Sequence, residues 1–490
     1  MKHALVIGGG FGGMAAAMRL SAKNYQVTLV DRAPMLGGRG QVFIKNGYKH
    51  DAGPTVITAP FLLEELFALF NEKLEDHIKL VPLTPWYRFY FADKTSFNYG
   101  GTLDETLAEI AKISPKDVAG YRRLLEHSQQ IFNIAFVQLS SVPFNRFFKM
   151  LSLVPKLIAL KSYQTVWGMV CRYLTHEKLR QAFSIQPLLV GGNPFSTTSI
   201  YGLIHYLERA YGVFFAMGGT GAIVSALSDL MKRNNIEILL NTTVTKVVVE
   251  NGISKKVIFA DGSSRAVDLI VSNADPTYLY TQMIDQNDVP IAAKLKLKVA
   301  HYSMGLFVVY FGSTKKYDDV AHHTIWLGKT YKELLHNIFD KKILSDDFSL
   351  YLHRPTATDT TFAPEGCDSF YVLCPVPNLQ GNVDWKNEGE RLKNKIIEAL
   401  DQTILPNLKQ HIVEDFYMTP EDFKENYLSS YGAGFSIAPI FRQSAWFRFH
   451  NKSEKIKNLY IVGAGTHPGA GLPGVLCSAK VVDSMLPRAS

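Results

Sequence analysis

The chain has 490 residues, enough for roughly two to four domains. Hydrophobic residues make up 47% of it and charged residues 20%, so the sequence predicts a globular protein and excludes a disordered or collagen-like chain. The 52 Lys and Arg against 44 Asp and Glu leave a net charge of +8, which suits nucleic acid, an anionic membrane surface or an acidic small molecule.

The N-terminal residues predict a compact βαβ unit, with strands over 4–7 and 26–31 and a helix over 14–22 between them. A helical pattern follows over 62–74, and strand-like sequence begins at Ile78. No apolar run reaches about 18 residues, so we expect no transmembrane helix. The four cysteines are far apart, which predicts neither a disulfide framework nor a zinc knuckle and favours a reduced, cytoplasmic compartment.

The middle of the chain is mainly helical over 103–183, with breaks at Pro115, Pro143 and Pro155, and a further helix is expected over 199–210. A second αβ pattern then begins with a glycine turn and helix over 218–235, followed by a hairpin that turns at 251–252. Apolar segments at 300–312 and 369–376 predict buried strands of a separate sheet, and a strand over 458–462 leads into a glycine-rich turn and a closing helix. We therefore predict an α/β fold, in which a Rossmann-like dinucleotide-binding domain is assembled from three separated segments.

A phosphate-binding motif directly follows the first strand. Gly8, Gly10 and Gly13 form a GxGxxG pattern that opens a helix, and Asp31 ends the second strand, where it can accept hydrogen bonds from a ribose. The glycines permit a tight turn, close approach of a pyrophosphate and close helix packing, and the helix N-terminus favours phosphate. The alternative is a purely structural turn.

The glycine turn that follows Asp31 bears on whether the bound dinucleotide is FAD or NAD. Gly37, Gly38 and Arg39 place a flexible backbone and a guanidinium where the pyrophosphate of an extended FAD would lie, although a surface arginine is the alternative. The block HDAGPTVIT at 50–58 and the C-terminal GAGTHPGAGLPGV strengthen the FAD interpretation.

Taken in order, these blocks, together with QPLLVGGNPFSTTSIY, MGGTGA, SNAD and QSAWFR, resemble the bacterial and fungal phytoene desaturases over essentially the whole chain. One departure is Asp31, where the wider superfamily usually has Glu. The resemblance implies FAD-dependent insertion of successive double bonds into 15-cis-phytoene to give all-trans-lycopene, with quinone or oxygen as electron acceptor. It implies these cofactor-binding residues: Gly8, Gly10, Gly13, Asp31, Arg32, Gly38, Arg39, Thr55, Val244, Gly463, Gly465, Gly474 and Val475.

The same resemblance divides the chain into two discontinuous domains. Residues 1–85, 216–283 and 455–490 are expected to bind FAD, and residues 86–215 and 284–454 to form a mixed sheet-and-helix domain that binds the substrate and a membrane.

Catalytic side chains are less defined by the sequence. His467 lies in the C-terminal glycine turn and is the candidate for proton transfer, although a structural hydrogen bond is at least as common for such a histidine. Asp51 is expected to satisfy backbone groups in a turn. The pair His322-His323 has no third ligand at a metal-like spacing, so we expect no metal site. Some aromatic residues are expected to line a substrate tunnel: Phe195, Tyr201 and Phe214.

A long hydrocarbon must reach the enzyme from a bilayer, because each CH₂ moved into water costs about 0.8 kcal/mol. No acidic residue occurs between Glu126 and Glu177, and a basic segment with apolar residues at helical spacing lies there. Its basic residues are Arg146, Lys149, Lys156, Lys161 and Arg172, and its apolar residues are Phe147, Met150, Leu151, Val154, Leu157 and Ile158. We expect this segment to lie peripherally on the inner membrane, with a kink or a new helix at Pro155. The alternative is an ordinary amphipathic helix packed on the core.

Three other classes of function are alternatives to this prediction. A carotene cis–trans isomerase, a desaturase of diapophytoene or another carotenoid oxidoreductase of this family would share the scaffold. A non-catalytic prenyl-lipid carrier would show a degraded nucleotide site, whereas the glycines and Arg39 are present. Nucleic-acid binding is not expected, because no recognisable motif accompanies the positive charge.

Overall fold

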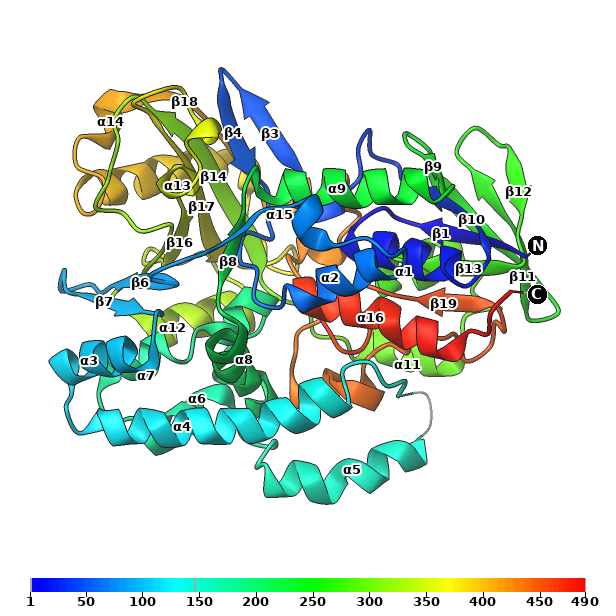
Figure 1. The fold of residues 1–490 in the computed structure, drawn as a ribbon, viewed down its shortest axis with the longest axis horizontal. Coiled ribbons are helices and arrows are strands. Elements are labelled where there is room, and N and C mark those ends of the chain that lie inside the picture. Colours follow the sequence, from blue (N-terminus) through cyan, green and yellow to red (C-terminus); the bar gives the residue numbers. More distant parts are fainter. Residues whose placement is uncertain (1, 145–146, 490) are drawn as a thin grey trace.

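Two β-sheets of different construction organise the chain, whose computed structural model describes residues 2–144 and 147–489. The first is a five-stranded parallel sheet, and the second is a seven-stranded sheet that is mainly antiparallel. Figure 1 shows the first sheet near both termini and the second on the opposite side of the molecule. Mixed sheets and helices agree with the α/β class that the sequence predicts.

The parallel sheet takes its strands from three distant stretches of the chain. Its order is β19 (Leu459–Ile461), β13 (Leu269–Ser272), β1 (His3–Ile7), β2 (Gln26–Val30) and β9 (Glu237–Leu239). The apolar side chains alternate between its two faces. Ala4 and Val6 pack into one hydrophobic cluster with helices, whereas Leu5 and Ile7 pack into another with the β10–β11 hairpin. The predicted N-terminal βαβ unit is therefore confirmed.

Helices cover one face of this sheet, and a small antiparallel sheet covers the other. The covering helices are α1 (Phe11–Ser21), α2 (Phe61–Ala68), α9 (Gly219–Arg233) and α16 (Leu472–Met485). The small sheet consists of β10 (Val244–Glu250), β11 (Ile253–Phe259) and β12 (Ser264–Ala266). Its first turn is the predicted one, since Asn251 and Gly252 both have positive φ. The predicted helix over 62–74 is shorter than expected, because the chain turns at Asn71, which has a φ of 60°.

The seven-stranded sheet contains the two apolar strands predicted at 300–312 and 369–376. Its order is β18 (Ile412–Met418), β14 (Gly305–Ser313), β17 (Asp368–Val376), β16 (Leu350–His353), β15 (His323–Trp326), β6 (Tyr87–Tyr90) and β7 (Ser96–Tyr99). Helix α13 (Trp385–Asp401) packs on one face of β14 and β17 through Trp385, Leu392 and Ile396. Side chains on the other face, among them Leu306 and Tyr371, line the cavity described below.

A layer of helices closes the molecule on the remaining side (Figure 1). It contains α3 (Leu103–Ile113), α4 (Asp117–Ile131), α5 (Phe147–Ala159), α6 (Val166–Tyr173), α7 (Glu177–Ala182) and α8 (Leu203–Tyr211). Helix α5 runs through Pro155, so no new helix begins there. Pro155 itself is exposed, and a proline inside a helix removes one N–H donor from the helical hydrogen bonds. None of the helices in the described ranges is long and apolar enough to span a membrane.

Shorter elements connect these layers. The strands are β3 (Val42–Lys45), β4 (Tyr48–Asp51), β5 (Leu80–Pro82) and β8 (Phe214–Ala216). The helices are α10 (Pro276–Tyr278), α11 (Ile291–Lys298), α12 (Tyr331–His336), α14 (Leu408–His411) and α15 (Pro420–Tyr427). Two irregular helical turns also occur, a π-helix η3 (Phe132–Gln138) and a 3₁₀ turn η12 (Ala445–Phe447).

Candidate functional site

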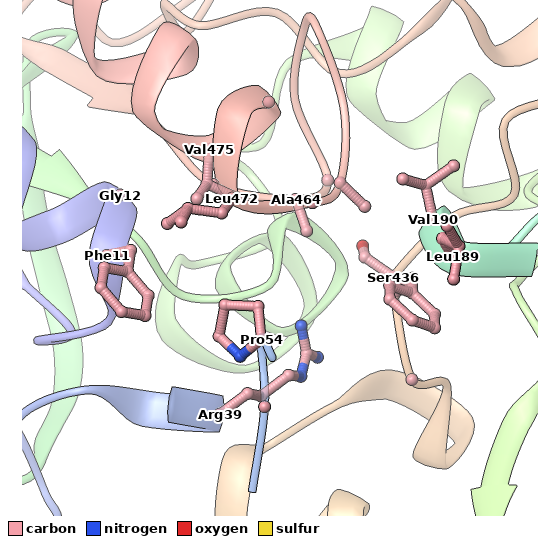
Figure 2. A pocket seen from close by; sticks show the side chains of 18 of the residues that line it. Phe11, Gly12, Arg39, Pro54, Leu189, Val190, Ser436, Ala464, Leu472 and Val475 are labelled. Atoms are coloured by element: carbon pink, nitrogen blue, oxygen red, sulfur yellow. The ribbon is translucent and has the colours of Figure 1, made fainter. Parts of the chain in front are cut away.

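A cavity of about 610 Å³ runs from the carboxyl ends of the parallel strands to the seven-stranded sheet. Residues that follow β1, β2, β13 and β19 all border it, which is where open α/β sheets bind their ligands. Figure 2 shows Phe11, Arg39, Pro54 and Val475 facing one part of this space and Leu189 and Val190 facing another. All predicted cofactor-binding residues line it except Gly13.

The turn between β1 and α1 is shaped by its glycines. Gly8 has a φ of +95°, and a Cβ on Gly13 would lie 1.9 Å from the Gly8 carbonyl oxygen, so Gly13 lets the helix pass against the strand. Gly10 caps α1, whose first turn carries no acidic residue and no side-chain cap. The helix N-terminus therefore presents unpaired N–H groups and a positive dipole end to the cavity.

Asn273, which the sequence analysis did not single out, joins this turn to the C-terminal turn. Its Nδ2 donates to the Gly8 carbonyl at 3.4 Å, and a Cβ on Gly463 would lie 2.6 Å from its Oδ1. A half-buried amide between two glycine turns leaves only a weak sequence signal, because its partners come from distant segments.

Asp31 lies at the end of the cavity where a ribose would bind. Its Oδ2 accepts from the Gly9 N–H at 2.5 Å and its Oδ1 accepts from the Ala33 N–H at 2.8 Å. Burial raises the pKa of the Asp31 carboxyl, against these hydrogen bonds. Each oxygen keeps a second lone pair, so the group can still accept a hydrogen bond from a hydroxyl.

The other residues predicted near Asp31 differ in what their side chains do. Arg32 borders the cavity, but its guanidinium donates to the Glu425 carbonyl at 2.8 Å. Val244 begins β10 and supplies an apolar wall. The Thr55 hydroxyl forms a hydrogen bond with the Tyr351 hydroxyl at 2.6 Å.

Arg39 provides a positive charge inside the cavity. Its Nη2 donates to the Ser429 hydroxyl at 3.0 Å, whereas Nε has no partner among the described residues. Burial lowers the pKa of Arg39, against the nearby carboxylate of Asp275, and an arginine stays protonated in either case. The guanidinium in Figure 2 points into the space beside Pro54, which suits an anionic group there.

The C-terminal glycine turn forms the facing wall. A Cβ on Gly474 would lie 2.5 Å from the Gly469 carbonyl oxygen, and one on Gly465 would lie 2.3 Å from Pro276, so both positions require glycine. Helix α16 begins at Leu472 and includes Val475 in its first turn, again without an acidic residue or side-chain cap there. A second helix N-terminus therefore borders the cavity.

These features fit FAD. Two helix N-termini and one arginine suit the pyrophosphate, Asp31 suits a ribose, and the glycine-lined walls leave room for close approach. Three buried polar atoms that line the cavity, Arg39 Nε, Asp275 Oδ2 and Ser436 Oγ, lack hydrogen-bond partners within the described ranges. Buried polar groups are normally paired, so these atoms indicate a polar ligand.

Away from the nucleotide residues the cavity wall is mainly apolar. It is lined there by Leu188, Leu306, Leu334, Ile338 and Leu373, among others. We call this part the hydrocarbon chamber. Tyr201, one of the aromatic residues predicted to line a substrate tunnel, lines this cavity.

The prediction is wrong for Phe195 and Phe214, which do not line the cavity. Phe195 packs against Trp167 at a centroid distance of 4.7 Å, and Phe214 pairs with Pro82 through the β5–β8 ladder.

One carboxylate, Glu208 on α8, lines the same cavity although its side chain is buried. The Tyr87 hydroxyl donates to its Oε1 at 2.9 Å, and no described residue partners Oε2. Burial raises the pKa of Glu208 to about 7. A carboxyl that changes protonation near neutral pH inside a cavity is suited to accept a proton. The sequence LIHYLERA predicts an ordinary helix, and nothing in it distinguishes Glu208 from a surface glutamate.

His467 lines the cavity but is already engaged. Its Nε2 lies 2.9 Å from the Leu139 carbonyl, which can only accept, so Nε2 carries a proton. The ring also packs edge-on against Phe144, and burial lowers its pKa to about 4. This geometry favours the structural hydrogen bond over proton transfer, and the catalytic role stays a prediction.

Helix α5 and η3 border the cavity on the side of the helical layer. Leu153 and Leu157 of α5, with Phe136 and Leu139, line it, whereas Val154 and Ile158 of α5 are exposed. Part of the basic segment predicted for membrane contact thus lies over the hydrocarbon chamber. Arg146 lies outside the described residues, as do the side chains of Phe147, Lys149, Met150 and Leu151.

The structure brings a third histidine to the pair His322-His323, although none follows at a metal-like spacing in the sequence. The antiparallel register of β15 and β16 places His353 directly opposite His323. His323 and His353 are 30 positions apart in the chain, which is too far for a metal-ligand spacing to be recognised in the sequence.

Known proteins resemble this chain in both sequence and structure. The family described as flavin containing amine oxidoreductase matches residues 11–482. The chain is 43% identical over 487 residues to a phytoene desaturase (lycopene-forming) of Pantoea ananas, with 99% of each chain covered. It is 45% identical over 488 residues to a phytoene desaturase (lycopene-forming) of Pseudescherichia vulneris, again with 99% of each covered. The solved structure of an oxidoreductase from Methanosarcina mazei has a similar fold, with a TM-score of 0.67 and 15% identity, covering 98% of this chain and 100% of that one.

Proposed function

This chain belongs to the flavin-containing amine oxidoreductase family, and from that premise we propose that it is a phytoene desaturase that converts 15-cis-phytoene to all-trans-lycopene. It is an FAD-dependent oxidoreductase acting on CH–CH bonds. The observation that carries the proposal is the continuity of one cavity, which has a glycine and arginine end suited to FAD and an apolar end suited to a hydrocarbon.

The chain's own residues have two tasks in this reaction, placing the substrate and removing a proton. Bound FAD would supply the oxidant for this reaction, because it can take up a hydride, which is one hydrogen together with two electrons. The leucines and isoleucines of the hydrocarbon chamber hold the chain by apolar contact and exclude water from the reacting carbons. We propose that Glu208, as a carboxylate, takes the remaining proton at Oε2 while Tyr87 holds Oε1.

The proposed activity is tested in a bacterial host that accumulates phytoene. Expression of the chain is expected to give red cells whose extract contains lycopene, and chromatography of the extract counts the double bonds added. Colourless cells with unchanged phytoene, despite FAD-loaded protein, would contradict the proposal. A rearranged product with no added double bond would favour the isomerase instead, and a product with oxygen would favour another carotenoid oxidoreductase.

We propose further that the enzyme sits peripherally on the inner face of the cytoplasmic membrane through α5 and α11. The helix α11, which the sequence analysis missed, exposes Ile291, Leu295 and Val299 at 78%, 61% and 67%. These residues are spaced four apart and form one stripe, with Lys294 and Lys298 exposed beside it. Helix α5 contacts η12, and Lys296 of α11 donates to the Trp446 carbonyl in the same turn at 3.4 Å, so the two helices lie near each other. Apolar residues among lysines suit an anionic leaflet.

Vesicle flotation tests this surface. We expect the protein to float with vesicles containing anionic lipid and to float less with neutral ones or at high salt. Replacing Ile291 and Leu295 by Asp is expected to abolish flotation while FAD content is kept. Replacing Val413 and Ile44, exposed apolar residues of other elements, by Asp is the matched control and should leave flotation unchanged. Equal flotation of both variants would contradict the assignment.

Two further parts of the function are proposals of the same kind. The electrons are expected to leave on a quinone or on oxygen, which anaerobic turnover with and without added quinone distinguishes. The two-domain division at 1–85, 216–283 and 455–490 against the rest is supported by the parallel sheet, whose strands all come from those ranges.

A further inference from the structure

Three histidines from two neighbouring strands meet inside the molecule. His322 precedes β15, His323 begins it, and His353 ends β16. One nitrogen of each lies within 4.8 Å of the others, and the side chains are 6%, 0% and 0% exposed. The cluster is therefore compact and shielded from water.

Hydroxyl groups hold two of these rings in a defined orientation. His322 Nδ1 lies 2.7 Å from the Thr358 hydroxyl, and His323 Nδ1 lies 2.8 Å from the Tyr351 hydroxyl. When the two hydroxyl oxygens accept these hydrogen bonds, Nδ1 of each histidine carries the proton. Nε2 of each ring is then unprotonated and presents a lone pair. An outer hydrogen bond of this kind is what orients histidine ligands around a metal ion.

The inward-facing atoms have nothing to bond. Nε2 of His322, Nε2 of His323 and both ring nitrogens of His353 lack hydrogen-bond partners anywhere in the described part of the chain. Asp51 adds a carboxylate oxygen, since its Oδ2 is also buried and unpartnered and lies 3.8 Å from His353 Nε2. Leaving so many buried polar atoms unpaired is unfavourable, and a cation would satisfy them together.

We propose that His322, His323 and His353 bind one divalent transition-metal ion, with Zn²⁺ the best match, and that the Asp51 carboxylate beside His353 completes its ligands. Zn²⁺ is commonly held by four ligands that are imidazole nitrogens and carboxylate oxygens in tetrahedral arrangement. Bonds of about 2.0–2.2 Å require the four side chains to draw inward around the ion.

The proposed ion has a structural effect on the cavity. Asp51 directly precedes the segment Ala52–Thr55, whose residues all line the cavity, and the ion joins that segment to β15 and β16. Tyr351 reinforces the same connection, because its hydroxyl also bonds Thr55. The site carries no redox step and does not depend on which hydrocarbon the enzyme uses.

Metal analysis of the FAD-loaded, full-length enzyme tests the proposal. The protein, without a metal-affinity tag, is treated with chelator, equilibrated with Zn²⁺ and desalted. We expect close to one Zn²⁺ per chain, and a loss of at least about tenfold in His323→Gln and His353→Gln. Replacing the zinc by Co²⁺ should give the visible absorption of a four-coordinate site.

His205→Gln is the matched control, because His205 on α8 is also buried but does not belong to the histidine cluster. It should retain the zinc. If a ligand variant does not fold, Thr358→Val serves instead, since loss of an outer-shell partner weakens metal binding by about 10–100-fold. Wild-type protein without zinc after this treatment, or zinc retained equally in His353→Gln and Thr358→Val, would overturn the proposal.

Discussion

The two ends of the cavity are built on different principles. At the nucleotide end, glycines bring backbone close to backbone, and a Cβ at Gly13 or Gly474 would collide with a carbonyl oxygen. At the hydrocarbon end, side chains of distant strands and helices supply the wall, and no single position is fixed by backbone geometry.

This difference separates what a substitution can do at each end. A backbone contact cannot yield when a methyl group is added, so the nucleotide end should respond in an all-or-none manner. An apolar wall can repack, so the hydrocarbon end should respond gradually. Glu208 is the exception, because it is one polar group in an apolar wall.

The strongest test of the comparison is Gly13→Ala. Its Cβ would lie 1.9 Å from the Gly8 carbonyl oxygen, so we expect loss of nearly all bound flavin, measured by visible absorbance of the purified protein. Gly262→Ala is the control, because no atom lies within 4 Å of the Cβ position of Gly262, although its φ is +84°. Wild-type flavin content in Gly13→Ala would refute the idea of a rigid nucleotide end.

Glu208→Gln tests the polar exception. Removing a proton acceptor is expected to lower kcat about 10²–10⁴-fold while FAD content is kept. Since the pKa of Glu208 is raised to about 7 and the carboxylate is the accepting form, the wild-type rate should rise with pH through about 7. The residual rate of Glu208→Gln should lack that step. A variant with full activity and an unchanged pH profile would remove Glu208 from the mechanism.

Arg39→Gln should have a smaller effect, because it removes a charge without disturbing the backbone. A charge-assisted hydrogen bond contributes about 1.5–3 kcal/mol, so we expect FAD to bind about 10–100-fold more weakly. Titration of the apoprotein with FAD measures this directly. Arg32→Gln is the comparison, since Arg32 donates to Glu425 and should alter the affinity far less. An equal loss in both variants would show that net charge alone is responsible.

Leu188→Met should have the smallest effect. The two side chains have similar volume, and such exchanges usually cost less than about 1.5 kcal/mol. We expect KM for phytoene in vesicles to change by less than about tenfold and kcat to be retained. A loss of activity as large as that of Glu208→Gln would show that the hydrocarbon chamber is as rigid as the nucleotide end.

The sequence predicted best the features that depend on local pattern. The β1–α1 turn, the hairpin at 251–252 and the two long apolar strands all form where the pattern indicates. Glycine spacing and hydrophobic period carry this information within one segment.

The features that sequence did not predict all depend on contacts between segments. Glu208 is distinctive only because α8 buries it, and His353 meets His323 only through strand register. Helix α11 has only eight residues, too few for a clear periodic signal from its exposed stripe. Phe195 and Phe214 were misplaced because aromatic character does not reveal which space a side chain faces.

The continuity of the cavity has a thermodynamic consequence. If the cofactor forms one wall of the hydrocarbon chamber, the apoprotein presents an incomplete chamber, and hydrocarbon must bind the holoenzyme more tightly than the apoprotein. Linkage is reciprocal, so bound hydrocarbon must slow or weaken FAD loss by the same free energy. The supply of membrane-dissolved substrate would then help determine how much of the enzyme keeps its cofactor.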